Sequence, residues 1–236
     1  MSEQLLSLSQ LTYSWPGEQT PVLDIDQLAL DAGSQVFVHG PSGCGKSTLL
    51  SVVAGVVQPD SGSLHFLGKD CLSMSKHQRD QLRADHMGYV FQQFNLLPYL
   101  SVLDNVMLTC QFSKLRRAKA QQRGGSVKQE ALRLLDHLQI PDSALAKPVS
   151  NLSIGQQQRV AVARALIGSP ALLIADEPTS ALDSVNRERF MDLLMAELQL
   201  GESSLLLVSH DEALAERFDQ TWSLAQLNRG GHHEVS

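Results

Sequence analysis

Apolar and polar residues alternate near the N-terminus in the manner of short strands. Leu5–Leu8 alternates along its length, and Val22–Leu30 resumes a partial alternation after the break at Trp15–Gly17. Alternation with a period of two indicates strands that bury one face. We therefore expect a small antiparallel β layer that leads into an apolar strand at Gln35–Val38.

Helical periodicity dominates the middle of the chain, from Ser101 to about Leu145. Apolar residues recur there at the spacing of helix faces, at Leu103, Val106 and Met107 and again at Leu132, Leu135 and Leu138. The pair Gly124 and Gly125 marks a break between helices. This pattern predicts a helical insert within an α/β domain.

Strands and helices alternate again in the last third of the chain. We expect helices at Gln157–Ile167 and Arg187–Leu198, and buried strands at Ala171–Ala175 and Leu205–Val208. Uninterrupted apolar strands are typical of a parallel sheet covered on both faces. The predicted architecture is a single α/β domain with a core of residues 1–92 and 153–228, a helical subdomain of about residues 93–152, and a loose polar tail that begins near residue 229.

Composition narrows the class of protein. The 236 residues are 43% hydrophobic and 19% charged, which is ordinary for a globular domain. The net charge of -6 gives no reason to expect a nucleic acid partner. Cys44, Cys71 and Cys110 are too few and scattered for a disulfide framework, which fits a reducing cytoplasm. No apolar run approaches the roughly 20 residues that cross a bilayer.

Gly40–Ser47 fits the phosphate-loop pattern G-x-x-x-x-G-K-[ST] without a mismatch, between an apolar strand and an apolar helix. Successive backbone N–H groups of such a loop form a concave anion site at the N-terminus of a helix. Lys46 is expected to reach the phosphates, and the Ser47 hydroxyl to bind Mg²⁺. The predicted nucleotide-binding residues are Gly40, Pro41, Ser42, Gly43, Cys44, Gly45, Lys46, Ser47 and Thr48.

Two further predicted strands end in polar residues that suit hydrolysis. Asp176 and Glu177 follow the strand Ala171–Ala175, and ligands of open α/β sheets bind at this carboxyl edge. Asp176 suits Mg²⁺, and Glu177 suits the polarisation of an attacking water. His210 follows the strand Leu205–Val208, where it can sense the terminal phosphate.

Three features keep two interpretations each. Tyr13 is either a half-buried strand aromatic or a platform for adenine. Lys114–Lys128 carries six basic and no acidic residues, and we favour a solvated face over contact with lipid or an acidic partner. In the tail, His232 and His233 suggest metal binding less strongly than a flexible end.

The segment Asn151–Arg159 closely resembles the ABC signature L-S-G-G-Q, with Ile154 in place of the first glycine. Ser180–Asp183 resembles the D-loop of the same family, and Gln92 resembles its Q-loop glutamine. His210 and Tyr13 match the switch histidine and the adenine-stacking aromatic. These motifs cover nearly the whole chain in the family's order, so the chain resembles the ATP-binding subunit of ABC transporters.

The resemblance implies an ABC ATPase fold, in which a P-loop NTPase core with a mostly parallel sheet carries the antiparallel β layer and the helical subdomain. It implies ATP and Mg²⁺ as cofactors, with Ser47, Gln92 and Asp176 near the metal. It also implies a head-to-tail homodimer, in which ATP lies between the phosphate loop of one copy and the signature of the other. The expected residues of that second surface are Ser153, Gly155, Gln156 and Asp183.

The text of Tyr89–Pro98 and the long spacing from Tyr13 to Val22 resemble the branch of MacB-type exporters and lipoprotein-releasing (LolD-like) systems. The D-loop text S-A-L-D is instead common in amino-acid importers, so an importer subunit remains an alternative, as does an FtsE-like signalling ATPase. The resemblance implies a permease that docks near Gln92–Tyr99, which would hold the protein at the cytoplasmic face of the membrane.

Overall fold

The computed structural model describes residues 4–180 and 182–230. They divide into two compact units. The first unit holds the chain up to Arg83 together with the part from Leu206 onward, and the second unit is Ala84–Leu205. The predicted limits of the helical subdomain, residues 93–152, stay a prediction.

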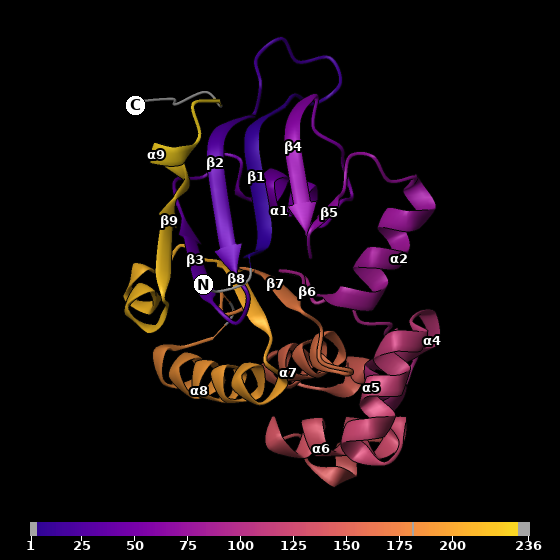
Figure 1. Cartoon of the computed structure of the whole chain (residues 1–236). Coiled ribbons are helices and arrows are strands. Elements are labelled where there is room, and N and C mark those ends of the chain that lie inside the picture. The colour runs from indigo at the N-terminus through magenta and orange to yellow at the C-terminus, as the bar shows by residue number, and fades with distance from the viewer. Residues whose placement is uncertain (1–3, 181, 231–236) are drawn as a thin grey trace. The chain divides into compact units, whose positions relative to one another are not determined.

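The first unit contains a four-stranded antiparallel layer, in the order β2-β1-β4-β5 (Figure 1). Its strands are β1 (Gln4–Tyr13), β2 (Leu23–Asp31), β4 (Ser61–Phe66) and β5 (Lys69–Asp70). Leu8 of β1 lies opposite Leu28 on one side and Leu64 on the other, and all three side chains are buried. The alternation in the sequence therefore predicted the antiparallel layer correctly, because apolar residues at every second position share one face.

Parallel strands complete the first unit. β3 (Gln35–His39) pairs in parallel with β9 (Gln220–Ser223), and on its other side it neighbours the end of β8 (Ser204–Val208). Every residue of β8 is buried, as the uninterrupted apolar run predicted. The first unit also contains the helices α1 (Lys46–Val53) and α9 (Leu224–Leu227), the 3-10 segment η3 (Glu212–Arg217) and most of α2 (Lys76–His86).

The second unit combines a parallel strand pair with helices. β6 (Met87–Val90) and β7 (Leu172–Asp176) pair in parallel, so the α/β fold class is confirmed. The predicted helical middle is divided by breaks at Leu108, Ser113 and Gly125. Its helices are α3 (Val102–Met107), α4 (Thr109–Phe112), α5 (Lys114–Gly124) and α6 (Val127–His137), and the later helices are α7 (Ile154–Leu166) and α8 (Ser184–Gly201), with 3-10 turns at Asp142–Ala144 and Val149–Asn151.

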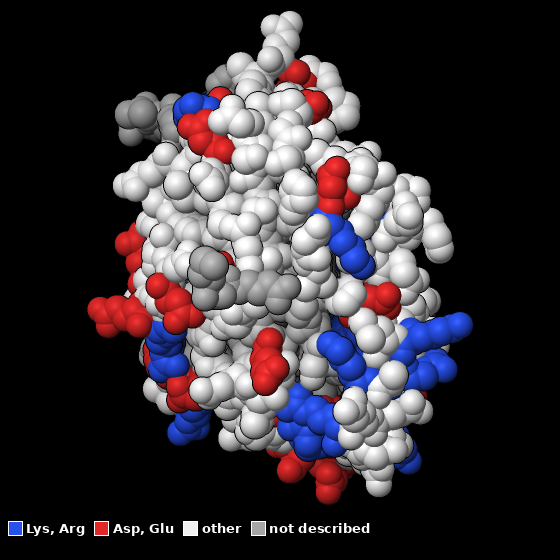
Figure 2. Space-filling model, viewed as in Figure 1, with Lys and Arg blue, Asp and Glu red and all other residues white. Residues whose placement is uncertain are grey.

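The basic stretch Lys114–Lys128 is not a uniformly solvated face. Lys and Arg side chains are prominent over α4 and α5 in Figure 2, but Arg116 is only 1% exposed. Its guanidinium donates to the backbone carbonyls of Ala165 (2.5 Å), Ile167 (2.8 Å) and Met87 (3.3 Å). Burial lowers the pKa of Arg116 to about 10. Charge alone could not reveal this role, because the carbonyls lie far away in the sequence.

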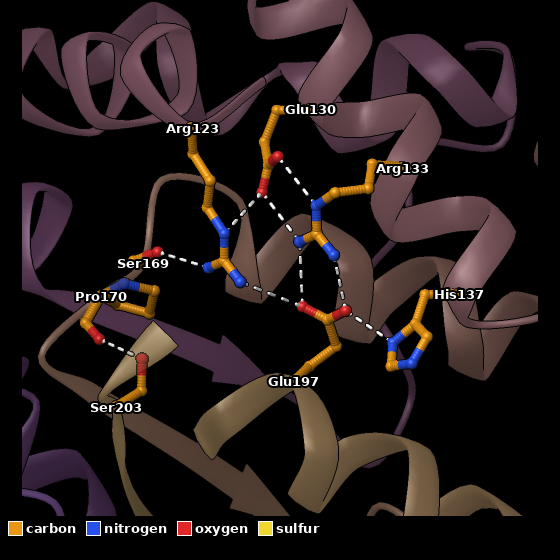
Figure 3. Close-up of polar contacts among 8 residues, drawn as sticks. All are labelled: Arg123, Glu130, Arg133, His137, Ser169, Pro170, Glu197 and Ser203. Carbon is orange, nitrogen blue, oxygen red and sulfur yellow. Dashed lines mark hydrogen bonds and ion pairs between the residues drawn. The ribbon is translucent and has the colours of Figure 1, made fainter. Parts of the chain in front are cut away.

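A buried ion network joins α5 and α6 to α8 (Figure 3). The side chains of Glu130 and Glu197 are each 1% exposed. Arg133 pairs with both carboxylates, at 2.9 Å from Glu130 and 2.8 Å from Glu197. Arg123 approaches both from the end of α5, and His137 Nδ1 lies 2.5 Å from Glu197.

The arginines keep the buried Glu197 carboxylate ionised. Burial raises its pKa, but hydrogen bonds from Arg133 and the charges of Arg133, His137 and Arg123 outweigh burial, so the net pKa lies below its ordinary value. The same two carboxylates raise the pKa of Arg133. Removal of one partner from such a group leaves buried charges without compensation.

We expect Glu197→Ala to lower the free energy of unfolding by about 1–3 kcal/mol, because the partly buried Arg133 loses its second carboxylate and keeps only Glu130. The free energy of unfolding is measured by urea denaturation of this variant, of a control variant and of wild type. Gln199→Ala, an exposed position on the same helix, is the matched control and should change stability by less than about 0.5 kcal/mol.

The effect should depend on pH. Because folding lowers the pKa of Glu197, its stabilisation is complete above the ordinary value of 4.5 and is lost as the pH falls through the lowered value. The difference between wild type and Glu197→Ala should therefore narrow in acid. Equal stability of the two proteins at neutral pH would contradict this account of the network.

Candidate nucleotide site

The phosphate loop joins the end of β3 to the start of α1 in the first unit. Gly40, Gly43 and Gly45 all have positive φ, at 154°, 81° and 99°. A Cβ added at Gly40 would lie 2.8 Å from Cys44 Sγ, and one at Gly45 would lie 2.9 Å from Leu23 Cδ2. At Gly45 both the left-handed backbone and the close packing therefore require glycine.

Lys46 is held inside this loop. Its side chain is 8% exposed, and Nζ donates to the carbonyls of Gly40 (2.7 Å) and Pro41 (2.8 Å). Ser47, one residue further along α1, is exposed. An ammonium, a hydroxyl and a glycine-rich turn at the start of a helix fit a polyphosphate with its Mg²⁺. Of the other predicted loop residues, Pro41, Ser42 and Gly43 are exposed, whereas Cys44 and Thr48 are buried.

His210 lies close to the phosphate loop, as the sequence predicted for a residue at the end of β8. It lines a cavity of about 380 Å³ together with Gly40 and Pro41. His39 and Glu212 line the same cavity. The Nδ1 atom of His39 lies 3.3 Å from the Glu212 carboxylate. Sequence reasoning missed this pair, although each residue directly flanks a predicted motif.

The aromatic residues near the end of β1 favour the structural interpretation of Tyr13. Its side chain is only 6% exposed. Its pKa is raised mainly by burial and to a lesser extent by the negative charge of the Asp60 carboxylate. Trp15 is 40% exposed and meets the Tyr13 ring edge to face, with ring centroids 5.1 Å apart. The exposed ring at this position is therefore that of Trp15, which the sequence analysis treated only as part of a turn.

In the second unit, Asp176 and Glu177 stand at the carboxyl end of β7, as predicted. Asp176 is the last residue of the strand, and its charge adds to burial in raising the pKa of Tyr89 on the adjacent β6. Glu177 has a positive φ of 49°, which is uncommon for a residue with a side chain. Gln158, fully buried on α7, donates to the carbonyl of Pro178 and so holds the loop that follows.

The loop Gln92–Tyr99 follows β6 and is held by two side chains that sequence reasoning missed. Arg164 of α7 donates to the carbonyls of Asn95 (2.6 Å) and Phe94 (2.7 Å), both residues with positive φ. Asn105 is fully buried and bonds both backbone groups of Leu97. Gln92 is exposed, and Tyr99 is 74% exposed, whereas Phe94, Leu96 and Leu97 are partly buried.

The signature segment begins α7 directly. The helix starts at Ile154 rather than at the predicted Gln157, and Ser153 is its N-cap. Ser153 Oγ accepts from the Gln156 N–H and the Gln156 side chain accepts from the Ser153 N–H, which forms a capping box. Ile154 is 58% exposed and lacks a positive φ, so its position does not demand glycine.

A cavity of about 550 Å³ brings the signature and D-loop together. Ser153, Gly155 and Asp183 all line it, whereas Gln156 does not. Asp183 is the N-cap of α8, and its carboxylate accepts from the Asn186 backbone N–H at 2.9 Å and from its side chain at 2.7 Å. These hydrogen bonds, the backbone one first, lower the pKa of Asp183. Ala181 of the D-loop lies outside the described residues.

The expectation of a loose tail is wrong for its first residues. Asn228 is 3% exposed, and Arg229 pairs with Asp24 and Asp26 at 3.1 and 2.6 Å. A Cβ at Gly230 would lie 2.6 Å from the carbonyl of Pro21, so this residue is also packed closely. His232 and His233 lie outside the described residues.

Across residues 4–180 and 182–230, no three His, Cys, Asp or Glu side chains are grouped so that they could hold a metal ion. Within the same ranges, none of the helices has the length and apolarity to span a bilayer.

Comparison with known proteins defines the family. The family model described as ABC transporter matches residues 23–180. The chain is 36% identical to the lipoprotein-releasing system ATP-binding protein LolD of Hydrogenovibrio crunogenus over 228 residues, 96% of each protein. It is 37% identical to the macrolide export ATP-binding/permease protein MacB of Burkholderia thailandensis over 91% of this chain but only 32% of that protein. The chain thus spans about a third of the MacB length.

A solved structure agrees with this assignment. The chain resembles the dimeric post-hydrolysis structure of the ATP-binding cassette MJ0796 bound to ADP and Pi, with 31% identity and a TM-score of 0.81. The match covers 96% of this chain and 97% of the other. The chain therefore belongs to the ABC transporter family, in which it is an ATPase cassette, and the predicted resemblance is confirmed.

Proposed function

We propose that this protein is the ATP-hydrolysing subunit that powers an ABC exporter of the MacB or lipoprotein-releasing type, by closure of a homodimer around ATP. The observation that carries the exporter assignment is the co-extensive match to LolD, which covers 96% of both chains. Its expected partner is a membrane permease, which would place the cassette at the cytoplasmic face of the membrane.

ATP binding rests on the phosphate loop and on one aromatic ring. The backbone of Gly40–Thr48 and the Lys46 ammonium hold the phosphates, and the exposed Trp15 ring stacks on adenine, with Tyr13 supporting it edge to face. Ser47, Gln92 and Asp176 suit Mg²⁺, which when bound neutralises phosphate charge during hydrolysis.

Glu177 and His210 act on the hydrolytic step. The Glu177 carboxylate orients and deprotonates the attacking water, because a positioned carboxylate at a strand end suits general-base catalysis. The positive φ of Glu177 aims this side chain away from the direction that a continued strand would give it. His210 lines the same cavity as Gly40, and its role in this proposal is to hydrogen-bond the terminal phosphate and its water.

The signature and D-loop form the surface that meets the ATP of a second copy. Ser153 caps a 13-residue helix, whose N-terminal dipole attracts the terminal phosphate. A Cβ at Gly155 would meet only Leu182 at 3.6 Å, so packing within the chain does not explain this glycine. Close approach of the nucleotide held by the second copy does, and Gln156 and Asp183 belong to the same surface.

The permease is proposed to dock on the loop Gln92–Tyr99. Tyr99 offers an exposed ring there. Arg164 and Asn105 hold the loop backbone through hydrogen bonds to its carbonyl groups. A loop held this firmly can transmit movement between Gln92 and a docked helix.

We expect Trp15→Ala to raise the KM for ATP roughly tenfold or more, because stacking of a base on an aromatic ring contributes about 1–3 kcal/mol. Trp15→Phe should restore most of the affinity. Tyr13→Phe, which keeps the buried ring, is the control and should leave the KM unchanged. The measurement is steady-state ATPase activity, and an unchanged KM in Trp15→Ala would exclude this ring as the platform.

We expect Glu177→Gln to lower kcat for ATP hydrolysis about a hundred- to ten-thousand-fold while ATP still binds. The variant should then accumulate as an ATP-dependent dimer in size-exclusion chromatography with light scattering. Glu216→Gln, an exposed surface position, serves as the control and should remain active and monomeric after turnover. Hydrolysis by Glu177→Gln at the wild-type rate would remove Glu177 from the mechanism.

The exporter assignment is tested by affinity capture of Glu177→Gln from native membranes in ATP, with mass spectrometry of the partner. We expect a permease with few membrane helices and a large extracytoplasmic domain. A permease with many helices and a solute-binding protein would instead identify an importer, and a division-signalling partner would identify an FtsE-like ATPase. Loss of the partner in Tyr99→Ala would support the docking loop.

A further inference from the structure

Asn228 connects the C-terminal segment to the phosphate loop. This residue follows α9 and is 3% exposed. Its Nδ2 group donates to the carbonyls of Val22 (2.8 Å) and Cys44 (3.1 Å), and Oδ1 accepts from the N–H groups of Asp24 (2.7 Å) and Gly230 (3.1 Å). Two donated and two accepted bonds use both protons and both lone pairs of the carboxamide.

The bond to Cys44 sets the orientation of one peptide plane in the loop. In a trans peptide the C=O of one residue and the N–H of the next point in opposite directions. The described chain has no cis peptide. Because Asn228 donates to the Cys44 carbonyl, the Gly45 N–H of the same peptide points away from Asn228.

Close packing makes this arrangement sensitive to small displacements. A Cβ at Gly45 would lie 3.4 Å from Asn228 Nδ2, besides its shorter contacts with Leu23 and Val22. Gly45 is also the N-cap of α1, so a rotation of its peptide would change the first turn of the helix that carries Lys46 and Ser47. The carboxamide therefore packs against the loop beside Gly45, where it donates to the Cys44 carbonyl.

We propose that Asn228 is a positioning residue for ATP, which fixes the Cys44–Gly45 peptide with its N–H facing the phosphates. This inference rests on the proposed ATP site. The residue contacts neither nucleotide nor water in this role and acts through the loop backbone. The contact that it supports is made both before and during hydrolysis, so its loss should raise the KM and leave kcat nearly unchanged.

The test compares Asn228→Asp with wild type in steady-state ATPase assays. Aspartate keeps the shape and the accepting oxygen at Oδ1, but it replaces the Nδ2 group that donates to Val22 and Cys44 with a second acceptor. We expect the KM for ATP to rise roughly tenfold, with kcat within about threefold of wild type. The KM for GTP should rise by the same factor, because the residue acts on phosphates rather than on the base.

Arg229→Gln is the matched control. It removes the ion pairs with Asp24 and Asp26, which attach the same segment to β2 without touching the phosphate loop. Its KM should equal that of wild type. An equal rise in KM for Arg229→Gln, or an unchanged KM for Asn228→Asp, would show that Asn228 only secures the tail. Absence of ATPase activity in wild type would instead count against the proposed function itself.

A measurement on the unaltered protein covers the case in which Asn228→Asp does not fold. The Gly45 amide should exchange rapidly with solvent deuterium in the free protein and become protected when ADP is added, as followed by ¹⁵N NMR. A Gly45 amide already protected without nucleotide would point into the protein, and would overturn the proposal.

Discussion

Buried backbone carbonyl groups of the functional loops are paired with side-chain donors from distant parts of the chain. A carbonyl that turns inward in a loop has no neighbouring strand or helix to satisfy it, and leaving it unpaired costs about 1–3 kcal/mol. The side chain of Asn228 donates to the carbonyl of Cys44, that of Gln158 to the carbonyl of Pro178, and that of Arg164 to the carbonyl of Phe94. These donors determine loop shape, and the site depends on loop shape.

Each donor sits on an element whose own position is fixed by apolar burial. Gln158 and Arg164 lie on α7, whose buried face includes Val160 and Val162. Packing thus orients the helix, and the helix delivers its polar side chains to the loops. Arg116 plays the same part within the second unit, where its guanidinium donates hydrogen bonds to three backbone carbonyls.

Sequence reasoning succeeded where the determinant was local. Gly40–Ser47 could be read directly, because a glycine-rich turn between strand and helix needs only adjacent residues. It left the two interpretations of Tyr13 open, since exposure of a ring depends on strands that pair across the sheet. The role of Asn228 was missed for the same reason, because its partner Cys44 is 184 residues away. The many basic residues of Lys114–Lys128 predicted a solvated face, and nothing in the local sequence indicated that Arg116 is buried.

The attachment of the phosphate loop by Asn228 also has a consequence for biosynthesis. At roughly 5–20 residues per second, the ribosome adds Asn228 about 10–40 s after Cys44. During that interval the nascent chain can form β1, β2 and α1, but the Cys44 carbonyl still lacks its donor. On the proposed role of Asn228, the phosphate loop therefore reaches its full nucleotide affinity only once synthesis has passed this residue.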